Sequence, residues 1–180
     1  MKAGSILCGL LGAAAGVLVC GLATAARADE LSDKTQAAKA DFLKKDESLK
    51  KLFDSASGYV LFPKVAKGGL GVGAARGTGL VFEKGKDKPT GESVLTQVSV
   101  GFQAGGQVYA ELIFFEDKTS LDNFRKGNFE FSAQVSAVAV TAGVGKNAKY
   151  EKGVMVLTLA EGGLMYEASV GGQKFNYTPK

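Results

Sequence analysis

The stretch Gly58–Glu83, GYVLFPKVAKGGLGVGAARGTGLVFE, decides how this chain folds. It opens with a run of β-forming residues that we expect to stop at Pro63, because proline donates no backbone hydrogen bond to a sheet. Glycines then alternate with Leu70 and Val72, so a strand here has almost bare backbone on one face. Such a strand suits a sharp sheet bend or the close approach of another backbone or a ligand. The glycines of this motif are Gly69, Gly71, Gly73, Gly77 and Gly79.

The sequence after this stretch alternates between β-prone runs and glycine-rich or polar turns. Residues 85–91 predict a polar hairpin loop, and Gly105-Gly106 predicts a tight turn, as do the later glycine pairs at 162–163 and 171–172. Leu112–Phe115 is apolar on both faces, which indicates a central strand covered by a helix. We expect about seven to nine strands. Their ranges are 59–62, 79–84, 94–104, 108–116, 129–140, 154–159, 164–170 and 174–177.

Two helices complete the predicted fold. Leu31–Ala56 has apolar residues at helical spacing, with Ser32 as its N-cap, and Asp117–Lys126 forms a short helix. No helix-sized segment separates the later strands, which argues against a parallel βαβ topology. The predicted class is therefore α+β: an N-terminal amphipathic helix packed on a strongly bent, largely antiparallel sheet, with one short inserted helix. The many glycines indicate that the sheet curls into a barrel or a tightly packed sandwich.

Residues 1–28 have the organisation of a signal peptide, with a positive start, an apolar run over 6–22 and an A-x-A cleavage site that ends at Ala28. A permanent membrane anchor is the alternative, but this run is short and broken by glycine, whereas a span needs ~20 residues. Lipidation at Cys20 is a further alternative, although the preceding valine departs from a lipoprotein signal. We predict a single domain over 29–180, exported to the periplasm or cell envelope.

The composition excludes several kinds of chemistry. The whole sequence has no His and no Trp, and both cysteines lie in the predicted signal peptide, which removes the common general base, thiol nucleophiles, disulfides and the usual zinc ligands. Without Lys2 and Arg27, 20 basic residues face 18 acidic ones, which is too balanced for a nucleic-acid binder. We therefore predict no enzyme, cofactor, metal or nucleic-acid partner, and the sequence indicates no particular protein partner.

Two motifs have alternative interpretations. The segment 69–74 fits the pattern G-x-G-x-x-A, but no helix can follow it, so we do not predict a dinucleotide site. The carboxylates, including Asp46 and Glu111, lie mostly where we expect element ends, and we expect them to be solvated surface charges.

Six lysines are the candidate lipid-binding residues. Lysines on the first helix could reach an anionic membrane surface, and those that flank the glycine motif could pair with phosphate headgroups beside exposed backbone amides. An ordinary solvated helix face and strand edge is the alternative for both groups. The candidates are Lys44, Lys45, Lys50, Lys51, Lys64 and Lys67.

Several segments, in order, resemble the SYLF domain, a family of lipid-binding modules. Phe62-Pro63 with Lys67-Gly68 and the glycines through Gly79 resemble its opening motif. Residues 99–105, with Gln107 and Phe115, are similar to its second motif. The short helix over 121–124 and the segments 161–163 and 167–171 are similar to its closing part.

This resemblance implies a non-enzymatic module of the bacterial cell envelope that binds anionic phospholipid through basic residues. In eukaryotic members an amphipathic N-terminal helix and basic residues are implicated in phospholipid binding. Of the basic residues in this chain, Lys67 aligns with a motif position. Some of those members also bind actin, an activity that we do not transfer to an exported chain. A small outer-membrane β-barrel or a structural envelope protein is the alternative, which the alternation and glycine content permit.

Overall fold

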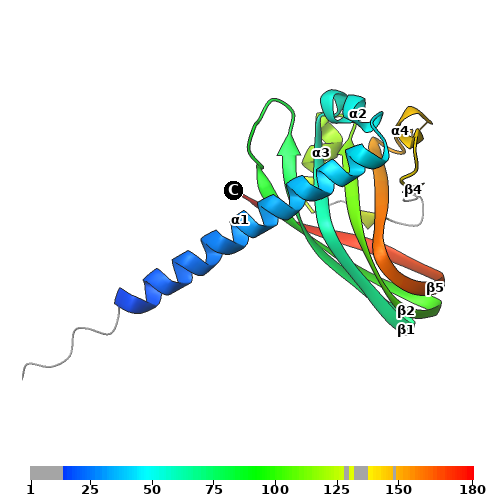
Figure 1. Cartoon of the computed structure of the whole chain (residues 1–180), viewed down its shortest axis with the longest axis horizontal. Coiled ribbons are helices and arrows are strands. Elements are labelled where there is room, and N and C mark those ends of the chain that lie inside the picture. The colour runs from blue at the N-terminus through cyan, green and yellow to red at the C-terminus, as the bar shows by residue number, and fades with distance from the viewer. Residues whose placement is uncertain (1–13, 128–129, 132–137, 148) are drawn as a thin grey trace, which may run out of the picture.

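The computed structural model of the chain describes residues 14–127, 130–131, 138–147 and 149–180 (Figure 1). A long helix and a short one precede the sheet, and two further short helices lie between its strands. The helices are α1 (Ala14–Lys45), α2 (Leu49–Ser55), α3 (Lys118–Arg125) and α4 (Val144–Asn147). The strands are β1 (Gly58–Glu83), β2 (Gly91–Phe115), β3 (Glu130–Phe131), β4 (Val138–Ala139) and β5 (Val154–Pro179).

The sheet is built from three very long strands. Its order is β1-β2-β5-β3 with antiparallel neighbours, and the short β4 pairs in parallel with β5. Among the described strands β1 has β2 as its single neighbour, so the sheet is open and does not close into a barrel. The predicted α+β class is confirmed. The expected count of seven to nine strands is wrong for the described residues, because several predicted short strands are parts of one long strand.

Each long strand is bent back on itself. Figure 1 shows β1, β2 and β5 running to one end of the molecule, turning together and returning. In β1 the turn lies at Gly71, whose φ of 72° is a conformation that glycine adopts easily. The two halves of β1 then lie so close that a Cβ placed on Gly79 would be 2.6 Å from the carbonyl oxygen of Leu61. The predicted strong bend is therefore confirmed, and close backbone packing explains the glycine motif.

The three glycine pairs lie inside long strands, which corrects three predicted turns. Gly105 and Gly106 lie inside β2 and pair with Gly69 and Gly68 of β1, while the predicted turns at 162–163 and 171–172 lie inside β5. The neighbouring strands stay paired at these positions. The ladder therefore keeps each strand continuous where its own sequence predicts a turn. The predicted loop after β1 is confirmed, since β1 ends at Glu83 and β2 begins at Gly91.

The expected strand end at Pro63 is also wrong. Pro63 lies within β1, where the pairing with β2 shifts between Phe62 and Val65. A bulge on an edge strand tolerates proline, because the missing N–H is not needed there. The β1 strand therefore passes its proline and continues to the bend.

Two hydrophobic clusters lie on opposite faces of the first half of the sheet. The inner core is enclosed by the bend and includes Phe62, Ile113 and Phe175, together with Phe124 of α3. The outer core lies under the helices and includes Leu61, Leu112 and Phe114 of the sheet, with Phe42 of α1 and Leu49 of α2. Residues 112–115 are all 0% exposed, so the predicted central strand covered by a helix is confirmed.

The helix predicted over residues 31–56 is two helices in the structure. α1 begins at Ala14, so the expected start at Ser32 is wrong, and the predicted cleavage position after Ala28 lies within α1. The first half of α1 projects beyond the sheet in Figure 1. No helix among the described residues is both long enough and apolar enough to cross a membrane.

The short inserted helix is confirmed as α3. Asp117 caps it, because its carboxylate accepts a hydrogen bond of 2.7 Å from the backbone N–H of Ser120. The strand predicted over 129–140 lies mostly outside the described residues, and its described parts are β3 and β4.

Candidate functional site

Four of the six candidate lysines lie together where α1 meets α2. Lys44 and Lys45 end α1, and Lys50 and Lys51 lie in the first turn of α2. All four are exposed. We call this group the lysine corner. Phe42 and Leu49 are 0% exposed and anchor the two helices on the outer core, which directs the lysines away from the sheet.

Asp46 lies within the lysine corner in sequence, but its side chain points into the protein. It is 5% exposed, and its carboxylate accepts hydrogen bonds from the backbone N–H groups of Ser48 at 3.0 Å and Gly145 at 2.7 Å. Burial disfavours the charged form, but these hydrogen bonds outweigh it, so the pKa of Asp46 is below its usual value. The expectation that Asp46 is a solvated surface charge is wrong, and Glu47 is left as the exposed acid of the link between the helices.

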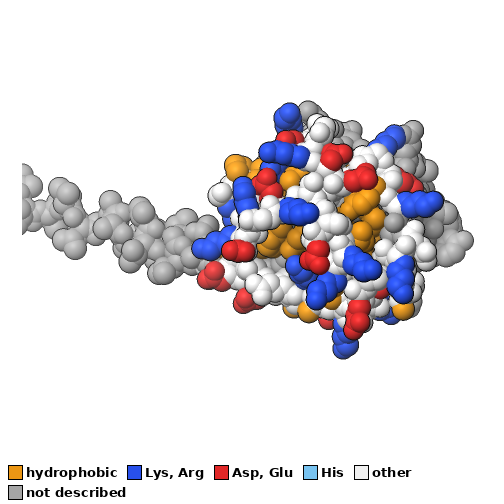
Figure 2. All heavy atoms as spheres, turned by 90° about the horizontal axis from the view of Figure 1, so that it is seen from above, with side chains coloured by type: hydrophobic (Ala, Val, Ile, Leu, Met, Phe, Trp, Pro, Cys, Tyr) orange, Lys and Arg blue, Asp and Glu red, His pale blue; other side chains and the backbone are white. Residues whose placement is uncertain are grey.

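Among the described residues, the surface at the end of the molecule that carries α2 has no large region in which all charged side chains have the same sign. Basic and acidic side chains are interspersed there around patches of hydrophobic surface (Figure 2). Any attraction for anions at this end is therefore short-ranged and local to the lysine corner, because opposite charges cancel over longer distances.

The other two candidate lysines lie on β1, apart from the lysine corner. Lys64 is exposed near the bulge. Lys67 pairs with Gln107, two residues before Tyr109 of the inner core, so the alternation of β2 places Lys67 on the inner face of the sheet. Its positive charge acts on Glu111 there. The structure thus brings four of the six candidates together and places Lys67 on the face opposite the helices.

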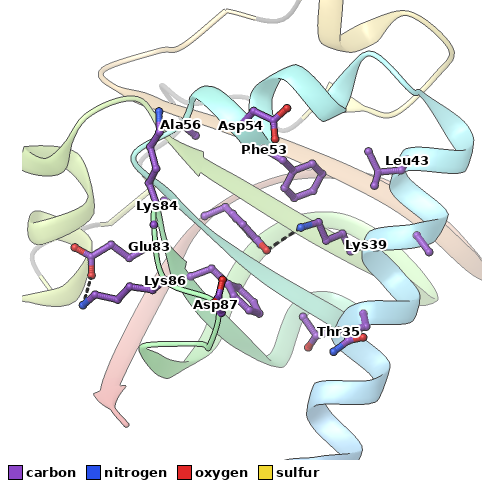
Figure 3. Close-up of a pocket in the computed structure, with 16 residues that line it drawn as sticks. Thr35, Lys39, Leu43, Phe53, Asp54, Ala56, Glu83, Lys84, Lys86 and Asp87 are labelled. Atoms are coloured by element: carbon purple, nitrogen blue, oxygen red, sulfur yellow. Dashed lines mark hydrogen bonds and ion pairs between the residues drawn. The ribbon is translucent and has the colours of Figure 1, made fainter.

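A groove of about 630 Å³ runs between α1 and β1, next to the lysine corner. Figure 3 shows its lining, which comes from α1, α2, the two ends of β1 and the loop that follows β1. The floor is aromatic: the Tyr59 ring stacks on Phe82 with centroids 4.8 Å apart and meets the edge of Phe53 at 4.9 Å. Such a floor offers an apolar surface within reach of charged groups.

Lys39 reaches across this groove from α1. Its Nζ donates a hydrogen bond of 3.1 Å to the hydroxyl of Tyr59 and lies 4.4 Å from the centroid of the Phe53 ring. A cation over an aromatic face is attracted by the negative face of the ring, so Lys39 is held in place. The charged residues of the lining balance in number, since Lys39, Lys84 and Lys86 stand with Asp54, Glu83 and Asp87. The groove is therefore amphipathic without a net charge from these side chains.

The inner face of the bent sheet holds a buried carboxyl group. Glu111 is 0% exposed, and its Oε2 accepts a hydrogen bond of 3.0 Å from Nε2 of Gln173. Its Oε1 has no hydrogen-bond partner in the part of the chain that the structure describes. Burial raises the pKa of Glu111 to about 7, against the opposing effects of Gln173 and Lys67. The expectation that Glu111 is a solvated surface charge is wrong.

The burial of Glu111 and the groove were not predicted from the sequence, for different reasons. Glu111 alternates with Tyr109, Ile113 and Phe115, so its position on the buried face follows from the period of two along β2. The groove has no comparable signal, since Lys39 and Tyr59 come from separate elements and meet only in the folded chain.

The structure defines the chain as a small α+β domain in which a helix with a basic end covers a sharply bent antiparallel sheet. A model of the family described as "Ysc84: Las17-binding protein actin regulator" matches residues 96–178, which span most of β2, α3 and nearly all of β5. Over these residues the chain matches the SYLF (Ysc84) family, as the motifs in its sequence predict.

A curated relative covers more of the chain. Beta cell expansion factor A from Aeromonas veronii is 32% identical over 130 residues, which are 71% of this chain and 48% of that protein. The chain therefore spans about half the length of this relative.

Proposed function

We propose that this chain is a non-enzymatic phospholipid-binding module that docks on anionic headgroups through the lysine corner. The observation that carries the proposal is that Lys44, Lys45, Lys50 and Lys51 are all exposed where α1 meets α2, while the side chain of Asp46 between them turns inward. The match to a family of lipid-binding modules supports the same partner.

The energetics of the lysine corner suit an anionic membrane surface. A basic residue close to an anionic bilayer contributes about 1 kcal/mol, so four lysines contribute about 4 kcal/mol at low salt if their effects add. The groove beside the corner adds apolar surface from Phe53 and Tyr59 within the same end of the molecule. Charged side chains next to apolar surface match the boundary between headgroups and acyl chains.

The proposed place of action is the bacterial cell envelope. The first residues of the sequence have the charge, apolar run and small residues of an export signal. An exported chain meets the anionic phospholipid of the envelope, which is the surface that the lysine corner fits.

The test is vesicle sedimentation of a variant with all four corner lysines changed to glutamine. We expect its affinity for anionic vesicles to fall by about 10³ at low salt, because about 4 kcal/mol is lost. A matched control changes four other exposed lysines, Lys88, Lys118, Lys126 and Lys149, to glutamine. If the control loses as much affinity as the corner variant, net charge alone determines binding and the proposed site is wrong.

A further inference from the structure

Three exposed apolar side chains lie at the bend of the sheet. Leu70 is 84% exposed, Val72 is 60% exposed and Val98 is 58% exposed, and they are the exposed large apolar residues among those whose side chains the structure describes. We call them the apex. Val98 pairs with Ala74 in the β1–β2 register, two residues from Val72, so the two valines are neighbours on one face.

The backbone of the bend holds the apex outward. Gly71 has a φ of 72°, and a Cβ placed on Gly69 would lie 2.5 Å from the Cα of Gly73. The chain therefore turns within a few residues, and Leu70 projects from the turn. The residues that follow alternate between exposed and buried along β1, which places Val72 on the outside with Arg76.

The charges around the apex are basic on β1 and absent from the adjacent part of β2. Residues 64–82 of β1 contain Lys64, Lys67 and Arg76 and no acid, and residues 93–110 of β2 contain no charged residue. On β5, residues 162–173 contain one acid, Glu167. Lys64 and Arg76 are exposed. They lie along β1 at roughly 20 and 13 Å from the nearest apex residue, behind the tip of the bend. An apolar tip with cations behind it complements an anionic bilayer, in which apolar groups reach the acyl chains and cations stay at the phosphates.

We propose that the apex inserts into the acyl-chain region of an anionic phospholipid bilayer, as a second membrane contact distinct from the lysine corner. This inference rests on the proposed function for its partner, a phospholipid surface. The two contacts lie at opposite ends of the sheet, since α2 directly precedes the start of β1 and the apex lies at the bend (Figure 1). A chain inserted by its apex therefore leaves the lysine corner free to bind a second bilayer.

The test uses a tryptophan reporter, because the chain has no Trp of its own. The variant Leu70→Trp places the reporter at the apex. The control Lys88→Trp places it at an exposed position in the loop between β1 and β2, at the other end of the sheet. Both full-length variants are mixed with vesicles of phosphatidylglycerol and phosphatidylcholine, with and without bromine on the acyl chains. Sedimentation of the same samples measures binding.

The expected result is a blue shift and bromine quenching for Leu70→Trp and neither for Lys88→Trp. The double variant Leu70→Asp with Val72→Asp should bind roughly tenfold or more weakly, because two side chains no longer enter the bilayer. It should also cluster vesicles less than the unaltered chain. Replacement of such exposed residues does not disturb either core.

Three results would overturn the inference. Sedimentation of Leu70→Trp with the vesicles but without a blue shift would exclude insertion of the apex while the proposed function stands. Absence of sedimentation would exclude phospholipid binding itself, and with it this inference. A blue shift without vesicles that grows with protein concentration would show that a second copy of the chain covers the apex.

Discussion

The buried carboxyl group of Glu111 makes the stability of the fold depend on pH in a specific direction. The side chain lies on the inner face of the bent sheet, held by Gln173, which also donates a hydrogen bond of 3.4 Å to Oε1 of Gln97. Glu111→Gln keeps the shape of the side chain and removes its charge, so it isolates the cost of ionisation inside the sheet.

The size and sign of the effect follow from the pKa of Glu111, which burial raises from 4.5 to about 7. Between these two values the folded chain holds a proton on Glu111 that the unfolded chain has lost. The free energy of unfolding is therefore highest, as far as Glu111 is concerned, below about pH 4.5. It falls as the pH rises to about 7 and stays lower above that pH. The rise in pKa corresponds to a loss of about 3 kcal/mol in the free energy of unfolding at pH 8.

The assay is urea unfolding of the unaltered chain and of Glu111→Gln between pH 4.5 and pH 8.5. The free energy of unfolding of the variant, minus that of the unaltered chain, should increase as the pH rises, by up to about 3 kcal/mol at pH 8. Glu47→Gln, a change at an exposed acid, should show no such trend. A difference between variant and unaltered chain that does not change with pH would refute the account of Glu111 as a buried, costly carboxylate.

Two further predictions concern the bend and the lysine corner. Gly79→Ala should lower the free energy of unfolding by about 1–3 kcal/mol, because the added methyl group meets the backbone of Leu61. Gly71→Ala has open space around the added methyl group, so it should lower the free energy of unfolding by about 1–2 kcal/mol through the positive φ alone. Asp46→Ala should cost about 1–3 kcal/mol by leaving the N–H groups of Ser48 and Gly145 unpaired, without loss of vesicle binding by the folded chain. Urea unfolding measures all three stabilities, and equal stability of the Gly79→Ala variant and the unaltered chain would contradict the close packing of the two halves of β1.

The elements that follow from local sequence could be predicted, and those that depend on pairing could not. The α3 helix has its cap at Asp117 and its apolar pair Leu121 and Phe124 within one short segment, so the sequence specifies it. The burial of residues 112–115 likewise follows from their composition. In contrast, Gly105-Gly106 has the chemistry of a tight turn, but it pairs with Gly69 and Gly68 of β1 and the ladder continues.

The candidate site was predictable in part for the same reason. The lysines of the corner lie within eight residues of one another, so helical structure is enough to bring them together. Lys67 could not be placed, because the face on which it lies depends on the register shift between Phe62 and Val65. The inward turn of Asp46 also depends on a distant partner, the N–H of Gly145.

The measurement that tests the central claim most directly is sedimentation of the unaltered chain with neutral and with anionic phospholipid vesicles over a range of salt concentration. Docking through lysines predicts binding to anionic vesicles that weakens as salt rises, because salt screens exposed charges. Neutral vesicles should bind the chain far more weakly. Equal binding to both kinds of vesicle, or no binding to either by the folded chain, would contradict the account.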